Sequence, residues 1–138
     1  FLGRWLKHGE GYPDWCVRFF HRQYAHWSDD AVHEKVVTTQ PAISLSGDLY
    51  HYSAESLHSY LQKQNQYTSL QAQALVKTGK KIIPFTLLLS PLLRFIKFYI
   101  FKQGWRDGVA GLIHILIGCF NSFCKYAKVL AIQREQSP

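Results

Sequence analysis

The sequence of 138 residues predicts an α/β fold class, in which a strand-and-loop part precedes a helical part. Residues 1–52 contain turn-forming glycine and proline and short segments where apolar and polar residues alternate, as in strands. From residue 53 onward, apolar residues recur three and four positions apart, which is the spacing of a helix face. The predicted division is therefore 1–52, 53–79 and 80–138.

The first part is predicted to hold short strands joined by turns. Gly9, Gly11 and Pro13 predict turns near its start. The expected strands are WCVRFF at 15–20, AVHEKVV at 31–37 and, after a Gly-Asp turn, part of LSGDLYHYS at 45–53. Residues 53–79 then predict a helix on the repeats Leu57, Tyr60 and Leu61 and Leu70, Ala74 and Leu75, with Gly79 as its stop.

Residues 82–101 form an apolar stretch whose only charges are Arg94 and Lys97. The length would allow a membrane span. However, Pro84 and Pro91 interrupt it, and a charge at the bilayer centre costs about 2.5–3.5 kcal/mol on insertion scales. Because the two charges lie three residues apart, we expect them on one face, directed at lipid head groups from a helix in the membrane interface. A spanning helix is the alternative.

The last segment predicts a second interfacial or packed helix. Residues 109–120 are apolar-rich but too few to span a bilayer. Small and polar residues fall on one stripe of this helix, namely Gly111, His114, Gly118, Asn121, Lys125 and Lys128. We interpret His114 as structural or interfacial.

Charge is unevenly placed along the chain. Residues 1–55 carry five basic and seven acidic residues, whereas residues 56–138 carry eleven basic and two acidic ones. A basic second half is compatible with nucleic acid, a protein partner or an anionic membrane. Its charges alternate with runs of Leu, Ile and Phe, which suit lipid better than a phosphate groove, so we expect no nucleic-acid partner.

Cysteine and methionine usage indicate the cellular context. Cys16, Cys119 and Cys124 are odd in number and form no CxxC pair, which favours free thiols in a reducing compartment. The sequence contains no methionine and no signal-peptide pattern at its start. We therefore expect the chain to be the later part of a longer protein.

The stretch WSDDAVHEKV concentrates acidic residues and a histidine. Glu34 could act as a general base with His33 beside it, but adjacent strand residues point to opposite faces, and the residues by themselves favour a solvated loop. Asp29 and Asp30 are typical turn or cap residues. His51 is either a packed side chain or a metal ligand.

The stretch HGEGYPDW and the arginines after it form a candidate binding region. Gly9 and Gly11 would let the backbone approach a ligand closely, beside Asp14. Arg18 and Arg22 could bind phosphate, and solvated surface charge is the alternative.

Taken in order, several segments resemble the C-terminal half of family 2 glycosyltransferases of the bacterial lipopolysaccharide-core type. They are GRWLKHGEGYPDWCVRFFHR, VHEKV, LYHYS, LQKQNQY, GKK and KYAKV, and the likeness runs from about Leu2 to Val129. The resemblance implies a GT-A fold, here its C-terminal part followed by amphipathic membrane-associated helices. It also implies that the nucleotide-binding half, with its Asp-x-Asp metal motif, lies outside this chain.

The resemblance assigns roles to the candidate residues. His33 and Glu34 stand where the family carries its acidic catalytic base. Gly9 and Gly11, with Asp14 and Arg18, stand on the acceptor side as substrate-binding residues, and His51 stands at a late histidine that binds the metal.

The implied reaction is inverting transfer of a sugar from a nucleotide-sugar donor to a lipid-linked saccharide acceptor. The implied cofactor is Mg²⁺ or Mn²⁺, and the implied location is the cytoplasmic face of the bacterial inner membrane. The rival hypothesis is a non-enzymatic membrane-associated helical module.

Overall fold

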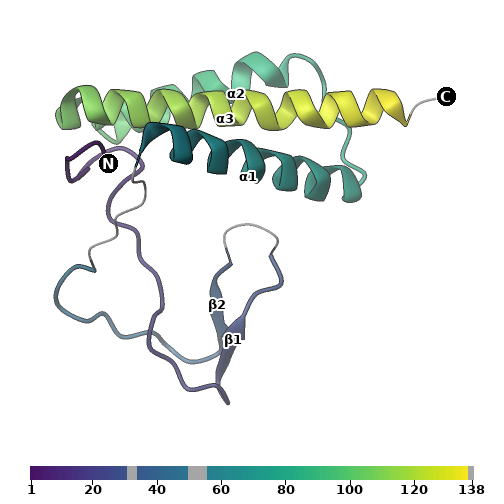
Figure 1. The fold of residues 1–138 in the computed structure, drawn as a ribbon. Coiled ribbons are helices and arrows are strands. Elements are labelled where there is room, and N and C mark those ends of the chain that lie inside the picture. Colours follow the sequence, from purple (N-terminus) through teal and green to yellow (C-terminus); the bar gives the residue numbers. More distant parts are fainter. Residues whose placement is uncertain (31–33, 50–55, 137–138) are drawn as a thin grey trace. The chain divides into compact units, whose positions relative to one another are not determined.

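The computed structural model describes residues 1–30, 34–49 and 56–136 (Figure 1). The chain divides into two compact units, each of which is described by itself. The helical unit comprises Phe1–Pro13 and Tyr52–Pro138, and the hairpin unit comprises Asp14–His51. The N-terminal segment thus packs with the helices, whereas the sequence grouped it with the predicted strands. Contacts between residues about 100 positions apart, such as His8 and Asp107, place this segment with the helices. Local sequence patterns give no information on such contacts.

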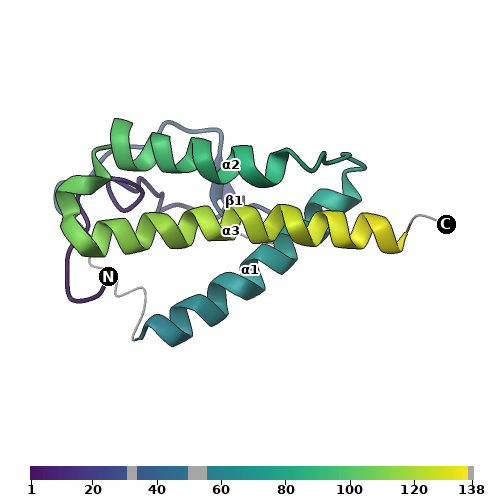
Figure 2. The ribbon, with the colours of Figure 1, turned by 90° about the horizontal axis from the view of Figure 1, so that it is seen from above.

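Three helices and two short helical turns build the helical unit. They are α1 (Leu57–Lys77), α2 (Thr86–Phe95), the π-helix η1 (Ile96–Phe101), the 3-10 helix η2 (Gly104–Asp107) and α3 (Gly108–Glu135). Helix α3 packs against both α1 and α2. Figure 2 shows α2 running alongside α3 while α1 crosses it at a larger angle. The helices expected within 53–79, 82–101 and the last segment are all present.

The ends of α1 follow the usual capping chemistry. The Ser56 hydroxyl accepts a hydrogen bond from the backbone N–H of Ser59 at 3.1 Å, which satisfies one free donor of the first turn. Gly79, with φ of +72°, follows the C-cap residue Thr78, so the predicted helix stop is confirmed. In α2, Pro91 lies inside the helix, so the expectation that it interrupts the segment is wrong.

The small-and-polar stripe of α3 is its packing side. Ala72, Ile82 and Val129 form a buried core cluster between the helices. Gly111 lies so close to the Gly104 carbonyl that an added Cβ would sit 2.6 Å from its oxygen. Asn121 donates a hydrogen bond to the Gln64 side chain of α1 at 2.7 Å. The sequence therefore located the stripe correctly, and the structure supplies its partners.

Lys128 connects α3 to α1 through a cluster of hydrogen bonds. Its ammonium donates to the Asn65 carbonyl and side-chain oxygens and to the Thr68 and Ser69 hydroxyls, at 2.7–2.9 Å. We expect Lys128→Met to lower the free energy of unfolding by about 1–2 kcal/mol, because these acceptors lose a charged donor.

Urea unfolding followed by circular dichroism measures this effect. Lys125→Met is the matched control, since the Lys125 ammonium lies only over the Tyr126 ring at 4.5 Å, and we expect less than about 1 kcal/mol for it. Equal losses for the two variants would contradict the assigned role of Lys128.

The hairpin unit contains two three-residue strands. β1 (Ala25–Trp27) pairs antiparallel with β2 (Val36–Thr38), with Ala25 opposite Thr38 and Trp27 opposite Val36. Of the predicted strand at 31–37, residues 36 and 37 belong to β2 and residues 34 and 35 do not, while residues 31–33 lie outside the described residues. The described residues are therefore mostly helical and contain one small two-stranded sheet.

The strand expected at 15–20 is wrong. This segment has no regular secondary structure, and its Trp15 and Phe19 side chains are 77% and 93% exposed. A strand needs a hydrogen-bonding neighbour, and none pairs with it in the described part of the hairpin unit. Of the segment at 45–53, residues 45–49 form no strand, and the rest lies outside the described residues.

Candidate functional site

Glu34 lies two residues before β2, where the hairpin connection re-enters the sheet. On either side of the connection, the Ser28 N–H donates to the Lys35 carbonyl at 2.8 Å, and the Lys35 N–H donates to the Ser28 hydroxyl at 3.1 Å. The Glu34 side chain is exposed, so its carboxylate is open to an incoming hydroxyl group. The structure therefore fixes the backbone beside Glu34 while leaving the candidate base accessible. His33 lies outside the described residues.

Asp30 makes a local contact with a neighbouring side chain, and its predicted turn or cap role stays a prediction. Its carboxylate accepts a hydrogen bond from the Ser28 hydroxyl at 2.9 Å. This contact accounts for Asp30 without a metal or a substrate.

Asp14 and Arg18 are exposed members of the same hairpin unit. Within its described residues, no hydrogen bond or ion pair joins their side chains to each other or to Glu34. The described part of the unit thus presents these three groups separately, and substrate binding by Asp14 and Arg18 stays a prediction.

Gly9 and Gly11 belong to the helical unit, where both permit close packing. The Gly9 N–H donates to the Lys102 carbonyl at 2.9 Å, and Gly9 has φ of +68°. An added Cβ on Gly11 would lie 2.7 Å from the Leu6 Cβ. These contacts explain both glycines structurally, and their proposed contact with substrate stays a prediction.

A metal site is not formed by the residues that the structure describes. None of them gather as three or more His, Cys, Asp or Glu side chains. The predicted ligand His51 lies outside these residues. The described side chains by themselves therefore provide no cluster that could hold a divalent cation.

A partly buried ion pair that the sequence did not predict joins the N-terminal segment to α2. Arg94 pairs with Glu10, and the Glu10 side chain is only 14% exposed. Gly118 of α3 makes room for the pair, because an added Cβ would lie 2.6 Å from Glu10 Oε2 and 2.9 Å from Arg94 Nε. The Arg94 Nε itself is buried without a hydrogen-bond partner. The expectation that Arg94 points with Lys97 toward head groups is therefore wrong.

Electrostatics around this pair follow from burial. Burial raises the pKa of Glu10, and the opposing charges of Arg94 and Lys97 only partly offset this. Burial likewise lowers the pKa of His114, helped by the positive N-terminus and Arg94. The centre of the His114 ring lies 5.1 Å from that of the Phe1 ring and 6.1 Å from that of the Tyr60 ring. These contacts agree with the interpretation of His114 as a structural residue. Gly118 on the stripe was the one feature of the sequence that indicated a close approach of another side chain to α3 here.

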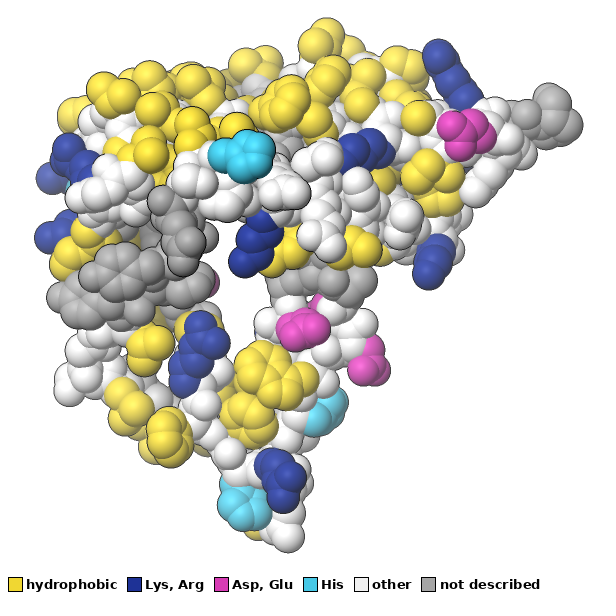
Figure 3. Space-filling model, viewed as in Figure 1, with side chains coloured by type: hydrophobic (Ala, Val, Ile, Leu, Met, Phe, Trp, Pro, Cys, Tyr) yellow, Lys and Arg dark blue, Asp and Glu magenta, His cyan; other side chains and the backbone are white. Residues whose placement is uncertain are grey.

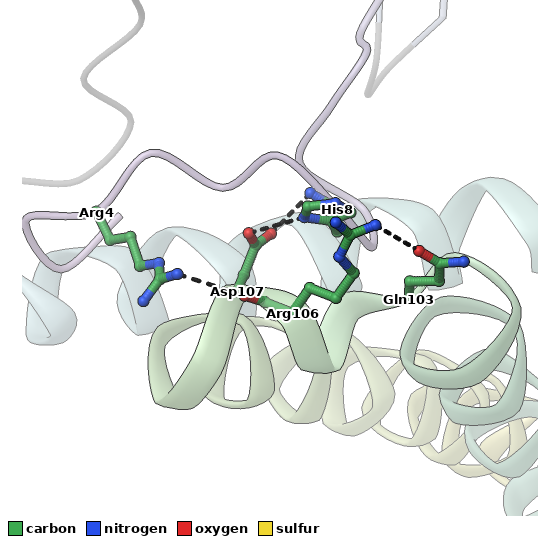
Figure 4. Close-up of polar contacts among 5 residues, drawn as sticks. All are labelled: Arg4, His8, Gln103, Arg106 and Asp107. Carbon is green, nitrogen blue, oxygen red and sulfur yellow. Dashed lines mark hydrogen bonds and ion pairs between the residues drawn. The ribbon is translucent and has the colours of Figure 1, made fainter.

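A second polar contact fixes the N-terminal segment at the start of α3 (Figure 4). The buried Asp107 accepts from the His8 backbone N–H at 2.7 Å, and its other oxygen lies 3.1 Å from His8 Nδ1. Burial opposes the charge of Asp107, but the His8 and Lys7 hydrogen bonds outweigh it and lower the pKa of the carboxyl. In the same view, Arg4 donates to the Arg106 carbonyl at 3.3 Å.

The outer side of α2 and α3 exposes large apolar side chains. On α2 and η1 these are Leu88, Leu89, Leu92, Leu93, Ile100 and Phe101; on α3 they are Val109, Leu116, Phe120 and Phe123. We call this set the apolar face. Figure 3 shows hydrophobic side chains covering the helical unit where α2 and α3 lie. Among the described residues, Gly104–Glu135 is the one helical segment long and apolar enough to cross a membrane by length and composition.

Comparison with known proteins finds bacterial relatives of this chain. A protein from Rickettsia prowazekii named uncharacterized glycosyltransferase is 30% identical over 123 residues, covering 83% of this chain and 42% of that protein. The chain is a homologue of bacterial glycosyltransferases. A Rickettsia bellii protein of the same name is 24% identical over 132 residues, covering 89% of this chain and 45% of that protein.

One of these glycosyltransferase relatives has a more specific name. The lipopolysaccharide core biosynthesis glycosyltransferase LpsC of Rhizobium meliloti is 30% identical over 100 residues, covering 71% of this chain and 37% of that protein. The chain thus spans less than half the length of the curated relatives it matches. No family model matches the sequence. No solved structure matches the fold.

Proposed function

We propose that the chain is the acid/base and membrane-contacting part of an inverting glycosyltransferase of family 2. The observation that carries this proposal is the 30% identity with a lipopolysaccharide core glycosyltransferase over 71% of the chain. The enzyme would take a nucleotide-sugar donor and glycosylate a lipid-linked saccharide in cell-envelope glycan synthesis. Its hairpin unit would belong to a GT-A domain.

Glu34 is the proposed general base. A saccharide hydroxyl is a weak nucleophile at neutral pH, so a carboxylate must take its proton as the oxygen attacks the anomeric carbon. The exposure of Glu34 and the ordered backbone beside it support this role. Attack on the face opposite the departing nucleoside diphosphate inverts the anomeric centre. His33, Asp14 and Arg18 are proposed to orient the acceptor. A substrate-binding role of Gly9 and Gly11 in the helical unit is a separate proposal, which rests on the resemblance alone.

The apolar face is proposed to lie in the membrane interface on the cytoplasmic side of the bacterial inner membrane. Arg94 supports this placement because its charge is turned inward and paired with Glu10. Helix α1 carries the polar surface of the unit, with exposed His58, Gln62, Lys63 and Gln66. One apolar side and one polar side are the features of an interfacial helical unit. An acceptor held in the bilayer by its lipid would then meet the enzyme at the surface.

A divalent cation, Mg²⁺ or Mn²⁺, stays part of the proposal for the intact enzyme, with His51 as its candidate ligand in this chain. When bound, such an ion neutralises charge on a departing diphosphate.

Release of nucleoside diphosphate from a panel of nucleotide sugars tests the proposal. We expect the intact protein, incubated with bacterial membranes, to release diphosphate from one donor class and to lose this activity in excess EDTA. Mg²⁺ or Mn²⁺ should restore the activity. Absence of release from every donor class by folded, membrane-bound protein would contradict the proposal and favour the non-enzymatic membrane module.

A further inference from the structure

Four exposed cations gather at one end of the helical unit, although they come from two distant parts of the sequence. They are Arg4, Lys7, Lys102 and Arg106, which we call the cationic end. Two hydrogen bonds join the two parts of the chain that carry them: the Arg4 guanidinium donates to the Arg106 carbonyl, and the Gly9 N–H donates to the Lys102 carbonyl. Figure 3 shows Lys and Arg side chains at the end of the helical unit where Figure 1 places the N-terminus and the start of α3.

Among the described residues, no ion pair joins a carboxylate to these four cations. Asp107 is buried, and both of its oxygens face His8 (Figure 4). The Arg106 guanidinium donates to the Gln103 side-chain oxygen, which is uncharged. The cationic end therefore keeps a positive surface that is available to an external anion.

Aromatic and apolar side chains adjoin the same cations. Trp5 and Trp105 are about half exposed, and the Lys7 ammonium lies 4.5 Å from the Trp5 ring centre. Phe101 and Val109, both members of the apolar face, are 77% and 73% exposed and flank η2. Tryptophan beside lysine and arginine, at the border of an apolar surface, is the composition of a membrane–water boundary.

We propose that the cationic end binds the head groups of anionic phospholipids and so directs the apolar face to acidic membranes. This inference rests on the proposed membrane contact and names its lipid partner. All four cations are exposed, which suits a plane of phosphates better than one enclosed anion. The adjoining apolar face distinguishes a lipid surface from a soluble phosphate compound. Each Lys or Arg near an acidic bilayer strengthens binding by about 1 kcal/mol, or roughly fivefold.

Flotation of the intact protein with lipid vesicles tests the inference. We expect binding to phosphatidylcholine vesicles containing roughly 30 mol % phosphatidylglycerol to exceed binding to pure phosphatidylcholine, and the excess to fall in about 1 M salt. Lys7→Gln with Lys102→Gln should weaken binding to the acidic vesicles roughly 25-fold while leaving binding to neutral vesicles nearly unchanged.

The matched control removes two lysines from the polar side. Lys63→Gln with Lys77→Gln changes the net charge equally on α1, and we expect less than a twofold effect. Equal losses in the two double variants would overturn the inference, because net charge alone would then explain binding. Equal binding of the unmodified protein to neutral and acidic vesicles would also overturn it.

Competition distinguishes lipid from a soluble ligand. Millimolar inorganic phosphate at constant ionic strength should not displace the protein from acidic vesicles, and displacement would indicate a soluble-anion site instead. The binding assay uses neither donor nor acceptor. Its failure therefore leaves the sugar-transfer proposal open, and failure of sugar transfer leaves the lipid measurement intact.

Discussion

Replacing Glu34 by Gln is expected to lower the rate of sugar transfer by about 10²–10⁴-fold, because the amide cannot accept the proton of the attacking hydroxyl. The side chain keeps its size, and its exposure means that folding should be little affected. The loss should fall mainly on kcat, since the acceptor can still occupy the site. Initial rates at saturating donor and acceptor measure this effect.

The neighbouring Asp29→Asn is the control for removal of a carboxylate from the same connection. Asp29 is exposed, and we expect its variant to keep transfer within about threefold. Vesicle binding by the Glu34 variant should equal that of the unmodified protein, which separates catalysis from membrane contact. Full activity in the Glu34 variant would remove Glu34 as the base and shift the assignment to another carboxylate.

Replacing Arg94 by Met is expected to destabilise the helical unit by about 2–3 kcal/mol at pH 8 and by less at pH 5. The change leaves the Glu10 carboxylate buried without its counter-charge. Because the Arg94 side chain is 36% exposed, we place the effect below the 3–5 kcal/mol typical of fully buried pairs.

The pH dependence follows from the direction of the Glu10 shift. Burial raises the pKa of Glu10, so the folded state binds a proton more readily than the unfolded state. Stability therefore falls as the pH rises from about 4.5 through the raised pKa. Without Arg94, the pKa of Glu10 rises further, so the loss of stability between pH 5 and pH 8 becomes larger.

Urea unfolding at pH 5 and pH 8 measures the Arg94 effect. Lys102→Met removes an exposed cation from the same connection between α2 and α3, and we expect it to change stability by less than about 0.5 kcal/mol at both pH values. Adding Glu10→Gln to the Arg94 variant should make the loss of unfolding free energy equal at the two pH values. An Arg94 effect of equal size at both values would contradict the proposed burial of Glu10.

Helices were predictable from the sequence because their signals are local. The repeats around Leu57 and Leu70 and the glycine at position 79 lie within the element that they describe. The sequence showed a small-and-polar stripe through Gly111 and Gly118 but did not say which side of α3 packs; the structure shows that both glycines are closely approached by other residues. The strand predicted at residues 15–20 failed for the opposite reason, since these residues are apolar enough for a strand but pair with no neighbour in the part of the chain that the structure describes.

The polar contacts of the helical unit were beyond the reach of sequence patterns. Glu10 and Arg94 are 84 residues apart, and His8 and Asp107 are 99 apart. Nothing in the segment HGEGYPDW distinguishes a loop that binds substrate from one that packs on a helix end. For the catalytic assignment, the resemblance to family 2 glycosyltransferases suggested the roles of residues 33 and 34, while the structure contributes the exposure of Glu34 and the contact between Ser28 and Asp30.

The central claim is that this chain serves sugar transfer to a lipid-linked acceptor, and analysis of the acceptor tests it most directly. The intact protein would be incubated with the donor that it cleaves and with lipid-linked saccharide, and the lipid fraction analysed by mass spectrometry and proton NMR. We expect the acceptor to gain one sugar residue, with the anomeric configuration opposite to that of the donor. An unchanged acceptor, in the presence of folded protein bound to the same vesicles, would contradict the claim.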